Sequence, residues 1–135
     1  MSRFAVRCTA AALLLCLIAA VPPWLHYAER RRQLAPFQGD WIDADTGRPV
    51  TIRGAAMTFA AYAGIDGADC TIGAVDLSCD PPRLVLTVPV SGHPGERATV
   101  YCIFRAEPGR VVVEQGVQYP TKFRDPPRGF TLLRR

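Results

Sequence analysis

Apolar residues alternate with other residues along most of the chain after residue 36. This period of two places successive side chains on opposite faces of an extended strand, whereas a helix repeats its apolar positions every three to four residues. No helical stripe of comparable length appears in this part of the sequence. The alternation therefore predicts half-buried β-strands and an all-β fold. The alternating apolar positions are Val50, Ile52, Met57, Phe59, Leu84, Leu86, Val88, Val90, Val100, Cys102, Phe104, Val111, Val113, Phe130 and Leu132.

Clusters of Gly, Pro, Asp and Ser separate the alternating segments at regular intervals. These residues favour turns, because Gly accepts positive φ, Pro fixes φ and Asp hydrogen-bonds to the nearby backbone. Short strands that follow one another in sequence favour a small, eight-stranded, antiparallel up-and-down barrel. The eight strands are expected near residues 40–44, 49–53, 56–62, 69–75, 83–90, 97–105, 110–116 and 129–134.

The N-terminal segment has the features of an export signal. Arg3 and Arg7 give it a short basic start, and residues 8–21 form an almost uninterrupted apolar run of about fourteen residues. This is the length of the apolar region of a signal peptide. A few further residues bring the run near the lower limit for a membrane-spanning helix, and Trp24 and Tyr27 suit a membrane interface. We favour an uncleaved signal anchor over a signal peptide that is removed.

The chain is therefore divided into three parts. Residues 1–28 are expected to form a hydrophobic helix that acts as signal peptide or signal anchor, residues 29–36 a linker, and residues 37–135 the barrel domain. The membrane is then a partner through the N-terminal segment. We expect an exported barrel, anchored in the inner membrane and facing the periplasm, or periplasmic or secreted if the signal is cleaved.

The positive charge of the chain belongs to the N-terminal segment. The whole chain has a net charge of +4, and residues 1–35 carry all of it, since residues 36–135 contain eleven basic and eleven acidic side chains. A neutral barrel domain lacks the basic surface that a phosphate backbone requires. We therefore expect no nucleic-acid partner.

Three of the five cysteines lie in the barrel domain. Export places them in an oxidising compartment, where one disulfide is expected. Cys70 and Cys79 bracket a segment that could form a tight hairpin, so their pairing is the first choice, and Cys79 with Cys102 is the alternative. The chain has no Cys-x-x-Cys motif and only two histidines, His26 and His93, so we expect no metal site.

No catalytic set can be assembled from the sequence, and no cofactor motif is present. His93 lacks a Ser or Cys placed beside it, and Cys102 lies among strand apolar residues, where a core position suits it better than a nucleophile's. The segment from Asp43 to Gly47 resembles half of a calcium loop but is better explained as a turn between the first two strands. We predict a protein that is not an enzyme. The alternative is an envelope enzyme of unknown reaction on the same barrel.

Two stretches of the sequence resemble a family of small uncharacterised exported domains first recognised in planctomycete genomes. Gln38-Gly39-Asp40-Trp41 is similar to the family's opening element, and the segment from Ile52 to Phe59, with Gly54 and Thr58, is similar to its second. Pro120-Thr121-Lys122-Phe123 and the final Leu132-Leu133-Arg134 match its close, while Tyr119 stands where the family prefers Arg. The family has no assigned activity, so the resemblance supports only fold and export.

A wider resemblance is to lipocalins, whose first strand opens with Gly-x-Trp and whose last strand supplies an Arg that covers the Trp ring. Gly39, Trp41 and Arg134 occupy the matching positions. The resemblance implies that the first and last strands meet and close a lipocalin-like barrel. At about 100 residues the barrel is small, and eight strands leave an interior that is either filled by side chains or holds one small ligand.

The stretch "YPTKF" is the most distinctive short segment of the domain. Pro120 and Phe123 predict a rigid loop that crosses one barrel end, either as a plug or as part of a binding rim. The functional hypothesis is a non-catalytic domain that binds a small apolar ligand or an envelope protein through this mouth or rim.

Overall fold

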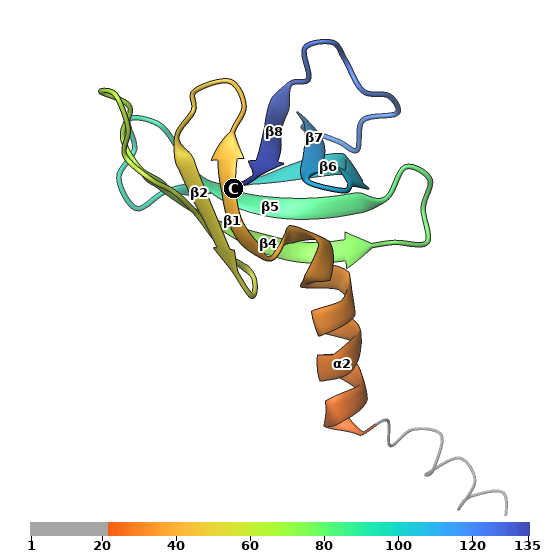
Figure 1. Ribbon diagram of the computed structural model, residues 1–135. Helices are drawn as coiled ribbons and strands as arrows, with labels where there is room; N and C mark the ends of the chain where they lie inside the picture. Colours follow the sequence, from red (N-terminus) through yellow and green to blue (C-terminus); the bar gives the residue numbers. More distant parts are fainter. Residues whose placement is uncertain (1–21) are drawn as a thin grey trace, which may run out of the picture. The chain divides into compact units, whose positions relative to one another are not determined.

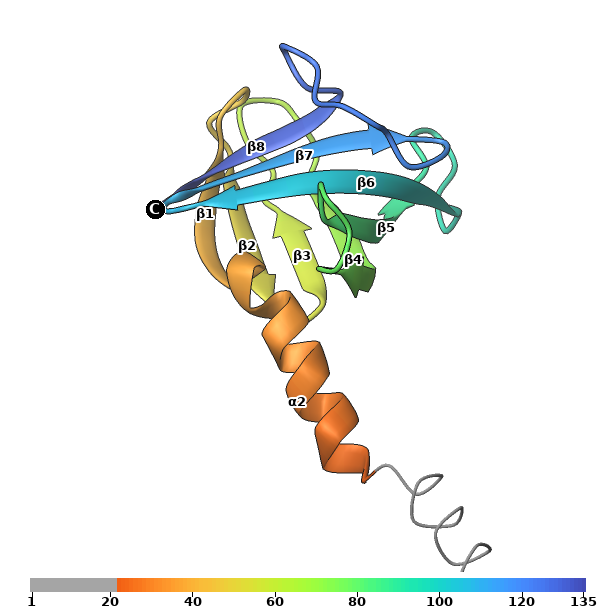
Figure 2. The same ribbon diagram turned by 90° about the vertical axis from the view of Figure 1, so that its right-hand side faces the viewer.

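The computed structural model describes residues 22–135, which contain a closed barrel of eight antiparallel strands (Figures 1 and 2). The eight-stranded antiparallel barrel predicted from the alternation is confirmed. A helix, α2 (Pro23–Leu34), and a 3-10 turn, η1 (Ala35–Phe37), precede the first strand. The strands are β1 (Gly39–Asp43), β2 (Pro49–Arg53), β3 (Ala56–Phe59), β4 (Ala68–Asp76), β5 (Arg83–Pro89), β6 (Arg97–Glu107), β7 (Arg110–Gly116) and β8 (Gly129–Arg134).

Each strand pairs with the next one along the chain, and β1 pairs with β8 to close the barrel. Short turns with a positive-φ glycine, such as Gly54 between β2 and β3 and Gly109 between β6 and β7, permit this order. The exception among the loops is the long connection 117–128 between β7 and β8, which extends away from the strand ends in Figure 2. Closure removes the exposed strand edges that would otherwise recruit other chains.

The alternating apolar side chains fill the barrel interior. The largest fully buried side chains of the domain are Trp41, Phe37 and Phe104, and the Phe37 and Phe104 rings meet edge to face with centroids 4.8 Å apart. Leu34 and Phe37, which precede β1, join this interior cluster. The end of the barrel where β1 begins is therefore occupied by side chains from outside the strands, and the packed domain starts a few residues before the expected boundary at residue 37.

A β-bulge interrupts the pairing of β4 with β5 between Ile72 and Val75. It shifts the interior face by one residue, because Ile72 and Val75 are both buried although they are three apart. Gly73 lies at the bulge, where a Cβ atom would stand 3.2 Å from the Val85 carbonyl oxygen. A bulge bends and twists the strand that carries it, which suits the curvature of a small closed barrel.

The seam between β1 and β8 is built by the segment from Phe37 to Trp41. The Arg134 guanidinium carbon lies 3.9 Å from the Trp41 ring centroid, and its Nη1 donates a 2.7 Å hydrogen bond to the Gln38 carbonyl oxygen. The Trp41 indole N–H donates to the Phe37 carbonyl oxygen at 2.8 Å. Gly39 is required here, since a Cβ atom would stand 2.6 Å from Arg134 Nη1 and φ is +118°.

Helix α2 carries its polar groups at the surface, and Glu29 and Arg32 form an ion pair of 2.8 Å. Trp24 and Tyr27 are both two-thirds exposed. Among residues 22–135, no helix is both long and apolar enough to cross a membrane. The predicted signal segment lies for the most part in residues 1–21, outside the described residues, and its role as signal peptide or anchor remains a prediction.

The predicted disulfide is wrong. Cys70, Cys79 and Cys102 are all free thiols. Cys70 and Cys79 cannot meet because the chain between them is not a hairpin: it continues along β4 as far as Asp76, and an extended strand rises about 3.3 Å per residue. Cys102 faces the interior from β6, whereas Cys79 lies in the turn after β4, where its thiol donates to the Asp76 carboxylate.

Replacing Arg134 by Ala is expected to lower the free energy of unfolding by about 1–3 kcal/mol, because it removes the guanidinium over Trp41 and its hydrogen bond to Gln38. Chemical denaturation followed by circular dichroism measures the change. Arg135→Ala is the matched control and should stay within about 0.5 kcal/mol of the unsubstituted protein. Equal stabilities of the two variants would show that the stack does not hold the seam.

Alkylation of the folded protein by iodoacetamide at about pH 8 is expected to modify Cys79 and spare Cys70 and Cys102. Burial raises the pKa of the Cys102 thiol to about 12 and also raises that of Cys70, so both stay protonated, and both are shielded by the interior. Mass spectrometry of proteolytic fragments gives the pattern, and denaturant should expose all three thiols. If Cys79 were labelled only after treatment with a reductant, Cys79 would be in a disulfide and the assignment of free thiols would be wrong.

Candidate functional site

One cavity of about 270 Å³ opens at the barrel mouth, the end at which β1, β3 and β5 finish. Its walls are largely apolar, and its polar groups are the Asp43 carboxylate, the Arg48 guanidinium and the Gln115 amide. Below it the interior is filled. The cavity is lined by Asp43, Arg48, Phe59, Ala68, Cys70, Leu86, Val88, Pro89, Gln115, Gly129 and Phe130.

Arg48 and Asp43 lie together at this mouth because a short turn joins β1 to β2. Asp43 is 5% exposed, and its Oδ2 lies 3.6 Å from Arg48 Nε, an ion pair that is too long for a hydrogen bond. The Arg48 guanidinium carbon also lies 4.5 Å from the Phe59 ring centroid. Arg48 Nε is buried and has no hydrogen-bond partner within residues 22–135. Arg48 Nε is thus shielded by Asp43 and its surroundings, while other atoms of Arg48 line the cavity.

The Asp43 to Gly47 segment is a turn, as expected. The Asp43 Oδ1 atom accepts the Asp45 backbone N–H at 3.1 Å, and the Gly47 N–H donates to the Asp43 carbonyl oxygen at 2.7 Å. The carboxylate of Asp43 thus stabilises the turn and faces the cavity at the same time. No cluster of three or more potential metal-binding side chains occurs in the described part of the chain.

A second buried region lies on the outer wall of the barrel. Ile103, Val112 and Glu114 alternate with interior residues and therefore point outward, yet none is more than 3% exposed. The loop 117–128 covers part of this wall: Ile103, Pro120 and Thr121 line one shared cavity. This wall is formed by β6 and β7, which pair Ile103 directly with Glu114.

Two aromatic residues attach the loop to the wall. Tyr119 meets the Tyr101 ring edge to face with centroids 5.2 Å apart, and the Arg83 guanidinium carbon lies 4.7 Å from the Tyr119 centroid. Phe123 is covered in the same way by Arg105, at 4.9 Å. The segment that contains Pro120 thus lies along the outside of β5 and β6. It does not plug the barrel mouth, because each of these contacts is made with an outward-facing side chain.

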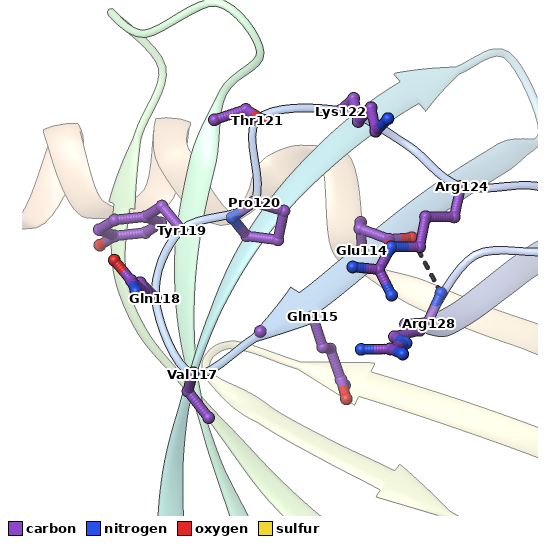
Figure 3. Close-up of a pocket in the computed structure, with 11 residues that line it drawn as sticks. Glu114, Gln115, Val117, Gln118, Tyr119, Pro120, Thr121, Lys122, Arg124 and Arg128 are labelled. Atoms are coloured by element: carbon purple, nitrogen blue, oxygen red, sulfur yellow. Dashed lines mark hydrogen bonds and ion pairs between the residues drawn. The ribbon is translucent and has the colours of Figure 1, made fainter.

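A pocket of about 420 Å³ lies between this loop and the end of β7 (Figure 3). Glu114 is at its base and is 1% exposed. Its Oε2 accepts the Arg128 backbone N–H at 2.9 Å, and its Oε1 lies 3.6 Å from Arg124 Nε. The loop supplies most of the other groups. The lining residues are Glu114, Gln115, Gly116, Val117, Gln118, Tyr119, Pro120, Thr121, Lys122, Arg124 and Arg128.

The residues considered for catalysis are not brought together. His93 lies in the exposed turn between β5 and β6, and its nearest ionic partner is Glu96 at 3.9 Å. Cys102 is fully buried in the interior, where desolvation raises its pKa to about 12 and leaves it a neutral thiol. Neither group lines the mouth cavity or the pocket beneath the loop.

Glu114 and its pocket were missed in the sequence, although one signal was present. Val111-Val112-Val113 is an apolar run that does not alternate, and the pair Cys102-Ile103 continues the same pattern on β6. A continuous apolar run is typical of a strand covered on both faces. The run indicated that the outer face of β6 and β7 is covered, but it identified neither the loop 117–128 as the cover nor Glu114 as a buried carboxylate.

Glu114→Gln is expected to loosen the loop, because a neutral amide replaces the charged acceptor of the Arg128 N–H and the partner of Arg124. Loss of about 1 kcal/mol would speed amide exchange of the Arg128 N–H roughly fivefold. Hydrogen exchange measured by NMR gives the rate. The control is Glu96→Gln, an exposed carboxylate in the turn between β5 and β6 that pairs only weakly with His93, whose change should leave the loop exchange unaltered. Unaltered exchange in Glu114→Gln would contradict the role of this carboxylate.

Comparison of the chain with protein-family models, with curated proteins and with solved structures finds no match. A barrel of this kind can host many unrelated functions. The two cavities and the groups that line them are therefore the features from which a function can be inferred.

Proposed function

We propose that this protein is a non-catalytic, exported, lipocalin-like domain that binds a small uncharged molecule with an apolar body in the barrel mouth. The observation that carries the proposal is the cavity of about 270 Å³ at the mouth of an otherwise filled barrel. Barrel mouths are common ligand sites, and such sites combine apolar walls with a few convergent polar groups.

The size of the cavity limits the ligand. Its volume lies just below the range of about 300–1,000 Å³ that is typical of pockets for drug-sized molecules. Trp41, Phe104 and Leu86 fill the interior beneath, so a long acyl chain has no room to descend into the barrel. A single ring or a short branched group fits the space.

The polar groups of the mouth select the head of the ligand. Asp43 and Arg48 carry opposite charges 3.6 Å apart, so the mouth has no net charge to attract an ion. The Arg48 side chain is 17% exposed and lines the cavity, and the Gln115 amide there offers both a donor and an acceptor. A neutral carbonyl or amide group would hydrogen-bond with the Gln115 amide without displacing Asp43 from Arg48.

Export is part of the proposal and rests on the N-terminal sequence. A basic start and an apolar run precede the barrel, and Trp24 and Tyr27 are exposed at the surface of α2. An anchored domain of this kind would present its mouth in the periplasm; a cleaved signal would release it there. N-terminal sequencing of the protein from membranes and from the soluble envelope fraction separates the two cases.

Benzamide is a suitable probe because it combines one apolar ring with a neutral amide. Titrated into the full-length protein in zwitterionic detergent micelles, it is expected to shift the backbone amide signals of Ala68, Cys70 and Val88. Toluene, which lacks the amide, should bind more weakly by roughly tenfold, the value of one hydrogen bond.

Val88→Trp fills the cavity and should abolish the benzamide shifts. Thr99→Trp places the same side chain on an exposed position of β6 outside the cavity and should leave binding intact. Circular dichroism shows whether both variants are folded. Absence of saturable shifts at the mouth, or undiminished binding by Val88→Trp, would refute the proposal. If benzamide binds at the mouth as expected, mass spectrometry of molecules that copurify with the intact protein would identify the natural ligand.

A further inference from the structure

We infer that the pocket beneath the loop 117–128 is a second binding site, separate from the barrel mouth, which takes an anionic group attached to a planar apolar body. The pocket measures about 420 Å³, within the usual size range of small-molecule sites. It lies on the outer wall, and Gln115 is the one residue that lines both this pocket and the mouth cavity.

The charge of the pocket selects an anion. Lys122, Arg124 and Arg128 line it together with a single carboxylate, Glu114, so two positive charges are in excess. Within the described chain, the side chains of Lys122 and Arg128 form no hydrogen bond or ion pair. In Figure 3 the guanidinium groups of Arg124 and Arg128 extend from the loop into the space beside Glu114 and Gln115. Guanidinium groups bind carboxylate and phosphate oxygens in a planar, two-pronged geometry.

Glu114 positions the segment that carries Arg124 and Arg128 and offsets only one of the three positive charges. It is buried, its Oε2 is occupied by the Arg128 backbone N–H, and its Oε1 lies 3.6 Å from Arg124 without a hydrogen bond. The carboxylate therefore holds both ends of the 124–128 segment beside the wall. Among the described residues, the Arg128 guanidinium stays free to take the anionic group, and the Lys122 ammonium adds a further unpaired positive charge to the lining of the pocket.

An apolar surface adjoins the cations. Val117 is 91% exposed, and Tyr119 presents its ring next to Pro120. A neighbouring hollow of about 460 Å³ is lined by Tyr101, Val117, Gln118 and Tyr119, so the two spaces share one wall. A ligand whose anionic group binds the Arg128 guanidinium can extend a flat apolar body across this wall, where Gln118 offers an amide.

The test uses phenyl phosphate, benzoate, inorganic phosphate and phenol as probes with the full-length protein in zwitterionic detergent. Backbone amide signals are followed by NMR. Phenyl phosphate is expected to produce saturable shifts confined to residues 116–128, which weaken as salt rises because the attraction is screened. Inorganic phosphate should shift the same signals with lower affinity, and phenol should shift none. Comparison with benzoate shows whether the site prefers phosphate or carboxylate.

The double variant Lys122→Gln and Arg128→Gln removes two charges and keeps the Arg128 backbone N–H that Glu114 accepts. It should weaken phenyl phosphate binding by at least about tenfold, since two charge-assisted contacts are lost. The matched control, Arg110→Gln with Arg135→Gln, removes two exposed charges outside the pocket and should change nothing beyond a small general effect. Equal weakening in both double variants, or no saturable shift at residues 116–128 in the unsubstituted protein, would overturn the inference. The comparison of phenyl phosphate with phenol uses the unsubstituted chain, so it tests the need for an anionic group even if a variant does not fold. Shifts of equal size with phenol would also overturn the inference.

Discussion

The stack of Arg134 on Trp41 is the interaction on which the rest of the barrel depends. It joins the last strand to the first, and closure of an eight-stranded sheet is possible only if those two strands pair. The guanidinium is held by the Gln38 carbonyl, and the indole by the Phe37 carbonyl. The turn before β1 thus anchors both partners. A residue other than glycine at position 39 would displace the Arg134 side chain from this place.

Closure in so small a barrel determines where a ligand can bind. Eight short strands enclose little more than their own side chains, and Trp41, Phe37 and Phe104 fill the end at which β1 begins. Free volume remains at the opposite end, where Arg48 and Asp43 border a cavity. The cavities of this small barrel therefore lie at its mouth and outside its wall.

The outer wall acquires its cavity from the longest loop of the domain. Residues 117–128 attach to β5 and β6 through Tyr119 and Phe123, each covered by an arginine from the wall. Beneath them Glu114 is buried with a backbone N–H and Arg124 as partners. A buried carboxylate is costly unless it is paired. This requirement explains why the basic residues of the loop gather beside it. These contacts with Glu114 hold the loop against the wall and leave a charged pocket between the two.

The sequence by itself determined the strands, their order and the inward set of side chains, because alternation and turn residues are local properties of neighbouring positions. Val50, Leu86 and Val113 were predicted to lie inside from the period of two alone, and Trp41 and Arg134 were singled out before their contact could be seen. Only the tertiary structure decided which outward faces are covered. The pairing of Glu114 with Arg124 and the separation of Cys70 from Cys79 depend on the path of a loop and the length of a strand. The alternation of apolar residues predicts neither the path of the loop nor the end of the strand, because side chains far apart in the sequence meet only when the sheet has closed.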